Sequence, residues 1–115
     1  MIYKDKDIYQ RSLNFGIRVI KLIDKLPRRI STIEIAKQTI RSAISVSANI
    51  AEGSSSSSKK EFVNFMNIAL KSAIETEHWL NLLQELNFSI DDSLAKENTE
   101  IIKILTTIVK KSKNP

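Results

Sequence analysis

Residues 40–77 read IRSAISVSANIAEGSSSSSKKEFVNFMNIALKSAIETE and hold two helical patterns separated by a serine-rich turn. The first pattern repeats small side chains every four residues, and Gly53 is a residue type that commonly ends a helix. Ser58 and Glu61 then match a capping box, in which the serine hydroxyl and the glutamate carboxylate accept from amides at the start of a helix. The stretch therefore predicts two consecutive helices joined by the loop Ser54–Ser58.

Two further helical patterns flank this hairpin. Upstream, apolar residues recur at helical spacing until Pro27, which disfavours helical geometry at the residue before it. Downstream, Asn87 ends the third pattern and a fourth follows. The four expected helices span about residues 5–26, 32–52, 59–86 and 91–112. Because short connections place consecutive helices antiparallel, we expect an all-α fold. More specifically, we expect an antiparallel up-down-up-down four-helix bundle that forms a single domain over residues 1–115.

The helical patterns contain more apolar residues than one buried stripe per helix requires. For the second helix, the expected core face is Ile33, Ala36, Ile40, Ala43, Ile44, Ile50 and Ala51. Further apolar rows lie away from the expected core, namely Ile35 and Val46 in the second helix and Val63, Leu70 and Ile74 in the third. Such rows indicate contacts between subunits, and the alternative is a wide core face in a monomer.

Charge is distributed unevenly along the chain. The net charge is +5, of which residues 1–60 contribute +7 and residues 61–115 contribute −2. A one-sided basic excess indicates a polyanion such as nucleic acid as a partner. The alternative is that lysine-rich helices only keep the protein in solution.

Basic residues form rows at helical spacing on the first two helices. They are Arg11, Arg18, Lys21 and Lys25 in the first helix, Arg28 and Arg29 just after it, and Lys37 and Arg41 in the second. Arginine can grip a phosphate through two hydrogen bonds. Aromatic residues make up only 6% of the chain, so base stacking is not indicated. Contacts to RNA would therefore go mainly to phosphates and would depend on salt.

No active site is visible in the sequence. There is no cysteine, and His78 is the single histidine, so neither a metal site nor an activated serine is indicated. A glycine-rich phosphate loop is also missing. We expect that the protein is not an enzyme and that it binds no cofactor and no metal ion. The sequence shows no signal peptide and no apolar run of membrane-spanning length, and we expect a cytoplasmic protein with no membrane partner.

The hairpin resembles the four-helix-bundle family of proteins encoded by intervening sequences in bacterial 23S ribosomal RNA genes. The residues that carry the resemblance are Arg41, the run NIAEG at 49–53 with Asn49, Glu52 and Gly53, and the run SKKEF at 58–62. The opening KDIYQRSLNF and the pattern of the fourth helix also fit. The family often has basic or bulky residues between the two runs, whereas this chain has only serine.

The resemblance implies a ring-like homopentamer. It also implies a relation to the accessory variability determinant of diversity-generating retroelements, a basic protein that binds nucleic acid and a partner reverse transcriptase. We therefore expect a non-catalytic, oligomeric RNA-binding accessory protein that assists such an enzyme. The alternative function is a protein–protein interaction adaptor with no nucleic-acid role.

Overall fold

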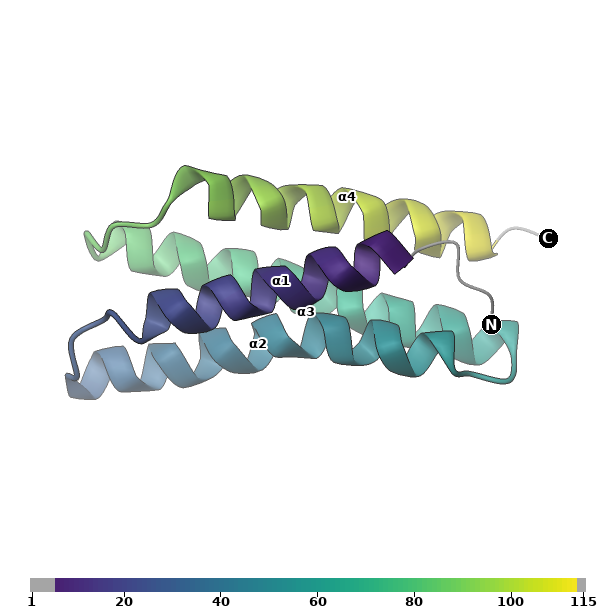
Figure 1. Ribbon diagram of the computed structural model, residues 1–115, viewed down its shortest axis with the longest axis horizontal. Coiled ribbons are helices and arrows are strands. Elements are labelled where there is room, and N and C mark those ends of the chain that lie inside the picture. The colour runs from purple at the N-terminus through teal and green to yellow at the C-terminus, as the bar shows by residue number, and fades with distance from the viewer. Residues whose placement is uncertain (1–5, 114–115) are drawn as a thin grey trace.

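The computed structural model describes residues 6–113, which form four α-helices (Figure 1). The helices are α1 (Lys6–Ile23), α2 (Ile30–Ser54), α3 (Lys59–Glu85) and α4 (Asp92–Lys113). The expected all-α four-helix bundle is confirmed. Each described helix end lies within three residues of its expected position. The expected start at Asp5 falls outside the described residues.

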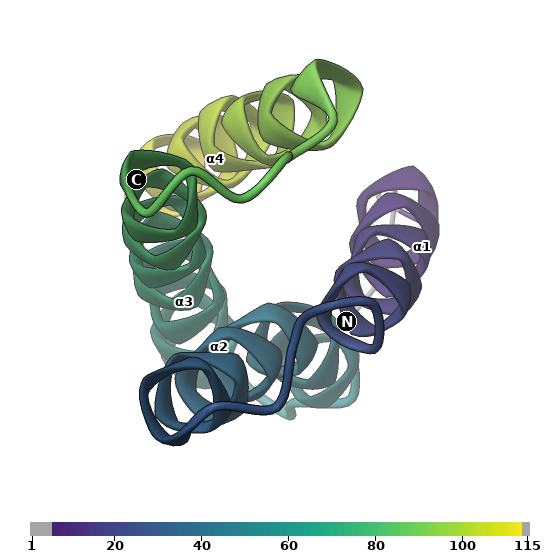
Figure 2. The same ribbon diagram turned by 90° about the vertical axis from the view of Figure 1, so that its left-hand side faces the viewer.

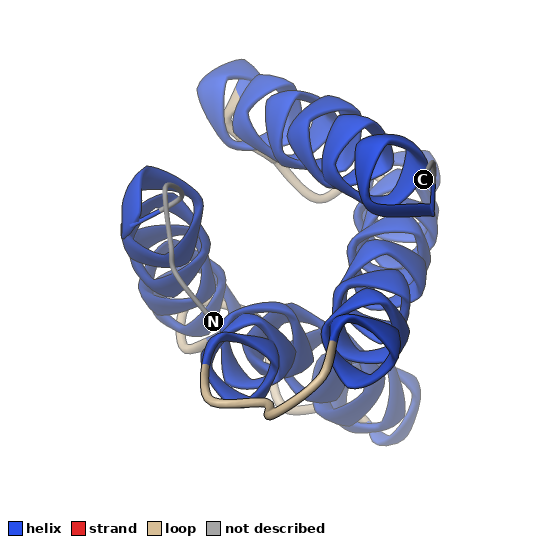
Figure 3. Cartoon of the chain, turned by 90° about the vertical axis from the view of Figure 1, so that its right-hand side faces the viewer, coloured by secondary structure: helices blue, strands red, loops and turns tan. Residues whose placement is uncertain are grey.

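The helices pack in a cycle in which each one contacts its neighbours in the chain. The bundle measures 48 × 21 × 18 Å, and consecutive helices run antiparallel along its long axis (Figure 1). The most extensive contact joins α2 to α3, and the least extensive joins α1 to α4. The two end views show this difference in contact: α1 and α4 stand apart, whereas α2 and α3 lie side by side (Figures 2 and 3).

The close α2–α3 contact depends on small and hydroxylated side chains. Ser72 donates to Ser45 at 2.9 Å, and Thr76 donates to Ser42 at 2.8 Å, so two hydrogen bonds cross the interface. Small side chains allow the two helix backbones to approach, and the bonded hydroxyls avoid the cost of burying unpaired polar atoms. Large apolar residues from all four helices fill the rest of the core, including Phe15 of α1.

The expected core face of α2 is wrong in part. Ile33 and Ile44 are largely exposed, with 44% and 46% of their surface accessible, whereas Thr39 and Val46 are fully buried. A prediction based on hydropathy places isoleucine in the core in preference to threonine. However, the Thr39 hydroxyl donates to the carbonyl of Ile35 at 2.7 Å, so this side chain enters the core with its hydrogen bond made. Ile33, Ile44 and Ala51 therefore face solvent, while Ile50 lies in the core as expected.

The helix ends confirm two expected signals and correct one. The Ser58 hydroxyl accepts from the Glu61 amide at 3.1 Å and caps α3, while the Glu61 carboxylate accepts from Ser57. Asn87 has a φ of 67° and terminates α3 with the paired backbone bonds of a Schellman motif. Gly53 does not end α2, because it lies within the helix and has no positive φ.

Candidate nucleic-acid interface

Two of the eight expected nucleic-acid-binding cations are held by α4. Arg11 donates to both carboxylate oxygens of Glu97, at 2.8 and 2.9 Å. These hydrogen bonds lower the pKa of Glu97 and raise that of Arg11. Arg18 donates to the Ser93 hydroxyl at 2.7 Å and lies 3.9 Å from Asp91. Arg11 and Arg18 therefore join α1 to α4 and are not free to take a phosphate in this arrangement.

The other six cations are exposed, and five of them lie at or near the α1–α2 turn, whereas Arg41 lies near the middle of α2. We call them the turn cations: Lys21, Lys25, Arg28, Arg29, Lys37 and Arg41. Within residues 6–113, none of their side chains makes a hydrogen bond or an ion pair. Their positive charge is therefore open to a ligand. They come from the end of α1, from the turn itself and from the first half of α2.

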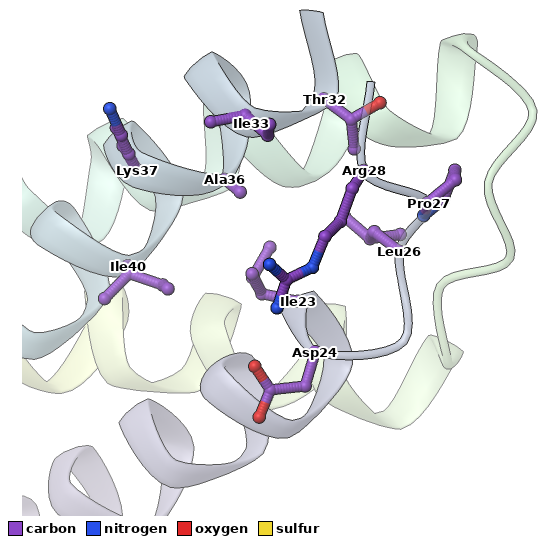
Figure 4. Close-up of a pocket in the computed structure, with 10 residues that line it drawn as sticks. All are labelled: Ile23, Asp24, Leu26, Pro27, Arg28, Thr32, Ile33, Ala36, Lys37 and Ile40. Carbon is purple, nitrogen blue, oxygen red and sulfur yellow. The ribbon is translucent and has the colours of Figure 1, made fainter. Parts of the chain in front are cut away.

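An open pocket of about 280 Å³ lies at the same turn (Figure 4). Ile33, Ile40 and Lys37 of α2 form one side of it, and the Arg28 side chain extends past Ile23 towards Asp24 (Figure 4). The pocket thus combines an apolar surface with two cations and the carboxylate of Asp24.

The expected subunit-contact residues are placed unequally. Val46 is fully buried in the core of its own chain, so it cannot contact another subunit, and its assignment is corrected. Ile35, Val63 and Leu70 are half-buried and pack against the same core. Only Ile74 is largely exposed, at 48%. The positions of these residues therefore agree in part with the alternative, a wide core face in a monomer.

Sequence reasoning missed an apolar surface between α1 and α2. Gly16 faces Ala43, since a Cβ on Gly16 would lie 3.8 Å from the Ala43 carbonyl oxygen. Both helices carry largely exposed isoleucines, which we call the isoleucine strip: Ile17 and Ile20 of α1 and Ile33 and Ile44 of α2. A patch of this kind on a surface is typical of a protein contact.

Potential metal ligands do not gather in the part of the chain that the structure describes. Among residues 6–113, no group of three or more His, Cys, Asp or Glu side chains is placed to hold a metal ion. His78 is exposed and packs edge-on against Trp79, with 4.8 Å between ring centroids. In the same part of the chain, no helix has the length and apolar character needed to cross a membrane.

Comparison with known proteins identifies the family. A family model described as 23S rRNA-intervening sequence protein matches residues 4–110. The chain belongs to this family. Its structure is also similar to that of a protein with unknown function from the S23 ribosomal protein family of Bacteroides thetaiotaomicron VPI-5482. The two are 34% identical, with 90% of this chain and 98% of that chain covered and a TM-score of 0.80. No curated protein matches the sequence. Neither of these descriptions names an enzymatic activity.

The motif of this 23S rRNA-intervening sequence protein is divided between packing and surface. A Cβ on Gly53 would lie 3.1 Å from the Cβ of Phe65, so this glycine allows α2 and α3 to approach. Asn49 donates to the Ser45 carbonyl at 2.8 Å within α2. Glu52 and Arg41 are exposed. The glycine and asparagine therefore have structural roles, and Arg41 remains open to a ligand.

This family member also carries a second basic region at the opposite end of the bundle (Figure 1). Exposed lysines at the start of α3 and at the end of α4 lie at this end: Lys59, Lys60, Lys110, Lys111 and Lys113. In the sequence the two groups are about fifty residues apart, and the antiparallel arrangement of α3 and α4 places them at the same end. At a helix C-terminus, lysines also interact favourably with the helix dipole.

Proposed function

We propose that this protein is a non-catalytic RNA-binding scaffold that self-associates. The observation that carries the proposal is the state of the turn cations: six basic side chains from the end of α1, the α1–α2 turn and the first half of α2, all exposed and none paired within residues 6–113. Cations without an internal partner exchange solvent for phosphate at little electrostatic cost. The family description, with its reference to 23S rRNA, supports RNA as the polyanion.

Binding of this kind is dominated by contacts to phosphates. Each neutralised phosphate releases counterions, so affinity falls steeply with salt, and contacts to phosphates carry little sequence information. The arginines of the set, Arg28, Arg29 and Arg41, can each hold a phosphate through two hydrogen bonds. Arg11 and Arg18 support the surface indirectly by fixing α1 against α4.

Self-association would strengthen these contacts. The isoleucine strip and Ile74 supply exposed apolar surface for contact between copies. A ring of copies, a pentamer in the expectation from the family, would repeat the turn cations, and weak contacts would then add through effective concentration. A partner enzyme, such as the reverse transcriptase implied by the resemblance, would act on the RNA held in this way.

The test compares two triple variants of equal charge change in an RNA-binding titration at moderate salt. Replacing Lys25, Arg28 and Arg29 with glutamine should weaken binding at least tenfold. Replacing Lys110, Lys111 and Lys113 with glutamine removes the same charge at the opposite end and should weaken it much less. Equal losses would show that the total charge matters and the turn does not, which contradicts the proposal.

The isoleucine strip favours a second candidate function, a protein–protein interaction adaptor. In that role the strip holds a different protein, and the cations serve only to keep the chain in solution. Purification after nuclease treatment distinguishes the two. The adaptor function is supported if a protein partner is retained and no RNA binds at low salt.

A further inference from the structure

A groove runs between the end of α1 and the start of α4. It consists of two cavities of about 190 and 460 Å³ that share Leu22, Lys25 and Asp91 in their walls. The groove exists because α1 and α4 have the least extensive contact of the bundle, and because α1 ends at Ile23. Beyond that point the chain turns away and leaves space in front of the α3–α4 turn.

The floor of the groove is apolar and reachable from solvent. Leu22, Leu26 and Phe88 line it, and all three are half-buried side chains that pack against the core. Phe88 is placed there by the Schellman motif that ends α3, because its amide donates to the carbonyl of Leu83 at 3.0 Å. An aromatic ring in such a surface can stack on a nucleobase.

The two edges of the groove differ in charge. On the α1 edge, Lys21 near the end of α1 and Lys25 in the turn after it are exposed and unpaired within residues 6–113, and Arg18 also lines this edge. On the α4 edge lies Asp91, whose carboxylate accepts from the Ser93 amide at 2.9 Å. A phosphate is attracted to the first edge and repelled by the second. The exposed Ser89 hydroxyl and the Asp91 carboxylate can accept hydrogen bonds from amino groups of a base.

We propose that this α1–α4 groove binds an unpaired nucleotide of RNA, with its phosphate on Lys21 and Lys25 and its base on the floor beside Phe88. The inference rests on the proposed function and goes beyond it, since the turn cations alone would accept any polyanion. A duplex presents phosphates but hides its bases in the stack, so it fills only the basic edge. A single strand fills both the edge and the floor.

The predicted preference is opposite to the purely electrostatic one. A duplex has the higher charge density, so phosphate contacts alone favour the duplex. If a base also occupies the floor, the gain from one base–aromatic stack, about five- to a hundredfold in affinity, should reverse this preference, so that an unstructured single strand binds tighter than a duplex of the same length.

The experiment is a fluorescence titration of the full chain with these two RNA probes. Phe88→Leu keeps the site apolar but removes the ring, and it should lower affinity for the single strand several-fold while leaving affinity for the duplex unchanged. Phe65→Leu makes the same change at a half-buried position at the other end of the bundle, so it serves as the control. Ultraviolet cross-linking of the single strand should place adducts within residues 22–27 or 88–91.

The outcomes separate this inference from the proposed function. A protein that binds neither probe contradicts the proposed function itself. The groove is overturned, with RNA binding retained, if the wild type prefers the duplex, if Phe88→Leu binds the single strand as tightly as the wild type does, and if no adducts form at the groove. If Phe88→Leu unfolds, the cross-link positions and the probe preference of the wild type still decide between these outcomes.

Discussion

Arg11 of α1 and Glu97 of α4, 86 positions apart in the sequence, are joined by two parallel hydrogen bonds of 2.8 and 2.9 Å. The bonds cross the helix pair that has the least other contact in the bundle. Paired bonds between guanidinium and carboxylate fix orientation as well as distance. This salt bridge therefore sets the position of α1, the helix that carries Lys21 and leads into the turn with Lys25, relative to α4.

Replacing Glu97 with glutamine should lower the free energy of unfolding by about 1 kcal/mol, the upper range for partly exposed ion pairs. Chemical denaturation at neutral pH measures this value. The control is Glu100→Gln, because Glu100 lies 4.0 Å from Lys103 on an exposed surface and its loss should have almost no effect. Equal effects of the two substitutions would show that the salt bridge does not stabilise the bundle.

The same pair predicts how stability depends on pH. Hydrogen bonds from Arg11 lower the pKa of Glu97 below its ordinary value of 4.5. A carboxyl with a depressed folded-state pKa adds stability above its unfolded pKa and loses it as the pH falls through the folded value. The difference in stability between wild type and Glu97→Gln should thus be constant near neutral pH and shrink below about pH 4.5. A difference that grows on acidification contradicts this assignment.

The two glycines should respond to alanine in opposite directions. Alanine is favoured over glycine within a helix by up to about 1 kcal/mol. At Gly16 the new Cβ would meet the Ala43 carbonyl oxygen at an ordinary 3.8 Å, so Gly16→Ala should raise the melting temperature. At Gly53 it would lie 3.1 Å from the Cβ of Phe65, which is fixed to the α3 backbone, so Gly53→Ala should lower it. Thermal unfolding of both variants checks the pair, and a stabilised Gly53→Ala would contradict the close α2–α3 packing.

Self-association should depend on the isoleucine strip. A charge buried at a contact between copies is costly, so Ile44→Glu should shift the nuclease-treated protein towards the monomer mass in light scattering. Ile30 is 92% exposed and lies outside the strip, and Ile30→Glu should leave the mass unchanged. If Ile44→Glu keeps the wild-type mass and Ile74→Glu reduces it, the contact lies at Ile74 instead.

The helix order and ends were predictable because their signals are local. Pro27, the Ser58 cap and Asn87 each act within a few residues, and the structure places a helix end near all three. The face of α2 was less predictable. Its buried hydroxyl groups form hydrogen bonds within the helix, as Thr39 does, or with α3, as Ser42 does with Thr76. A hydropathy scale takes no account of such hydrogen bonds.

The cations of the candidate interface could be predicted from the sequence. Which of them bind to α4, and which have no partner within residues 6–113, could not be predicted. Arg11 and Arg18 share a helical row with Lys25, yet only the packing of α1 on α4 reveals that Glu97 and Ser93 hold the two arginines. The groove beside Phe88 was also beyond reach, because it depends on where two separate turns meet. A low content of aromatic residues does not show where one of them is accessible.

If RNA phosphates bind to the turn cations, the salt dependence of RNA binding should change when these cations are removed. For a single strand, each phosphate contact contributes a slope of about −0.7 to log Kobs against log salt. Replacing Lys25, Arg28 and Arg29 with glutamine should therefore make the wild-type slope shallower by about 2, while the matched replacement of Lys110, Lys111 and Lys113 leaves it nearly unchanged. A slope that stays the same in the variant without Lys25, Arg28 and Arg29 would show that the phosphates bind elsewhere, which would contradict their binding to the turn cations.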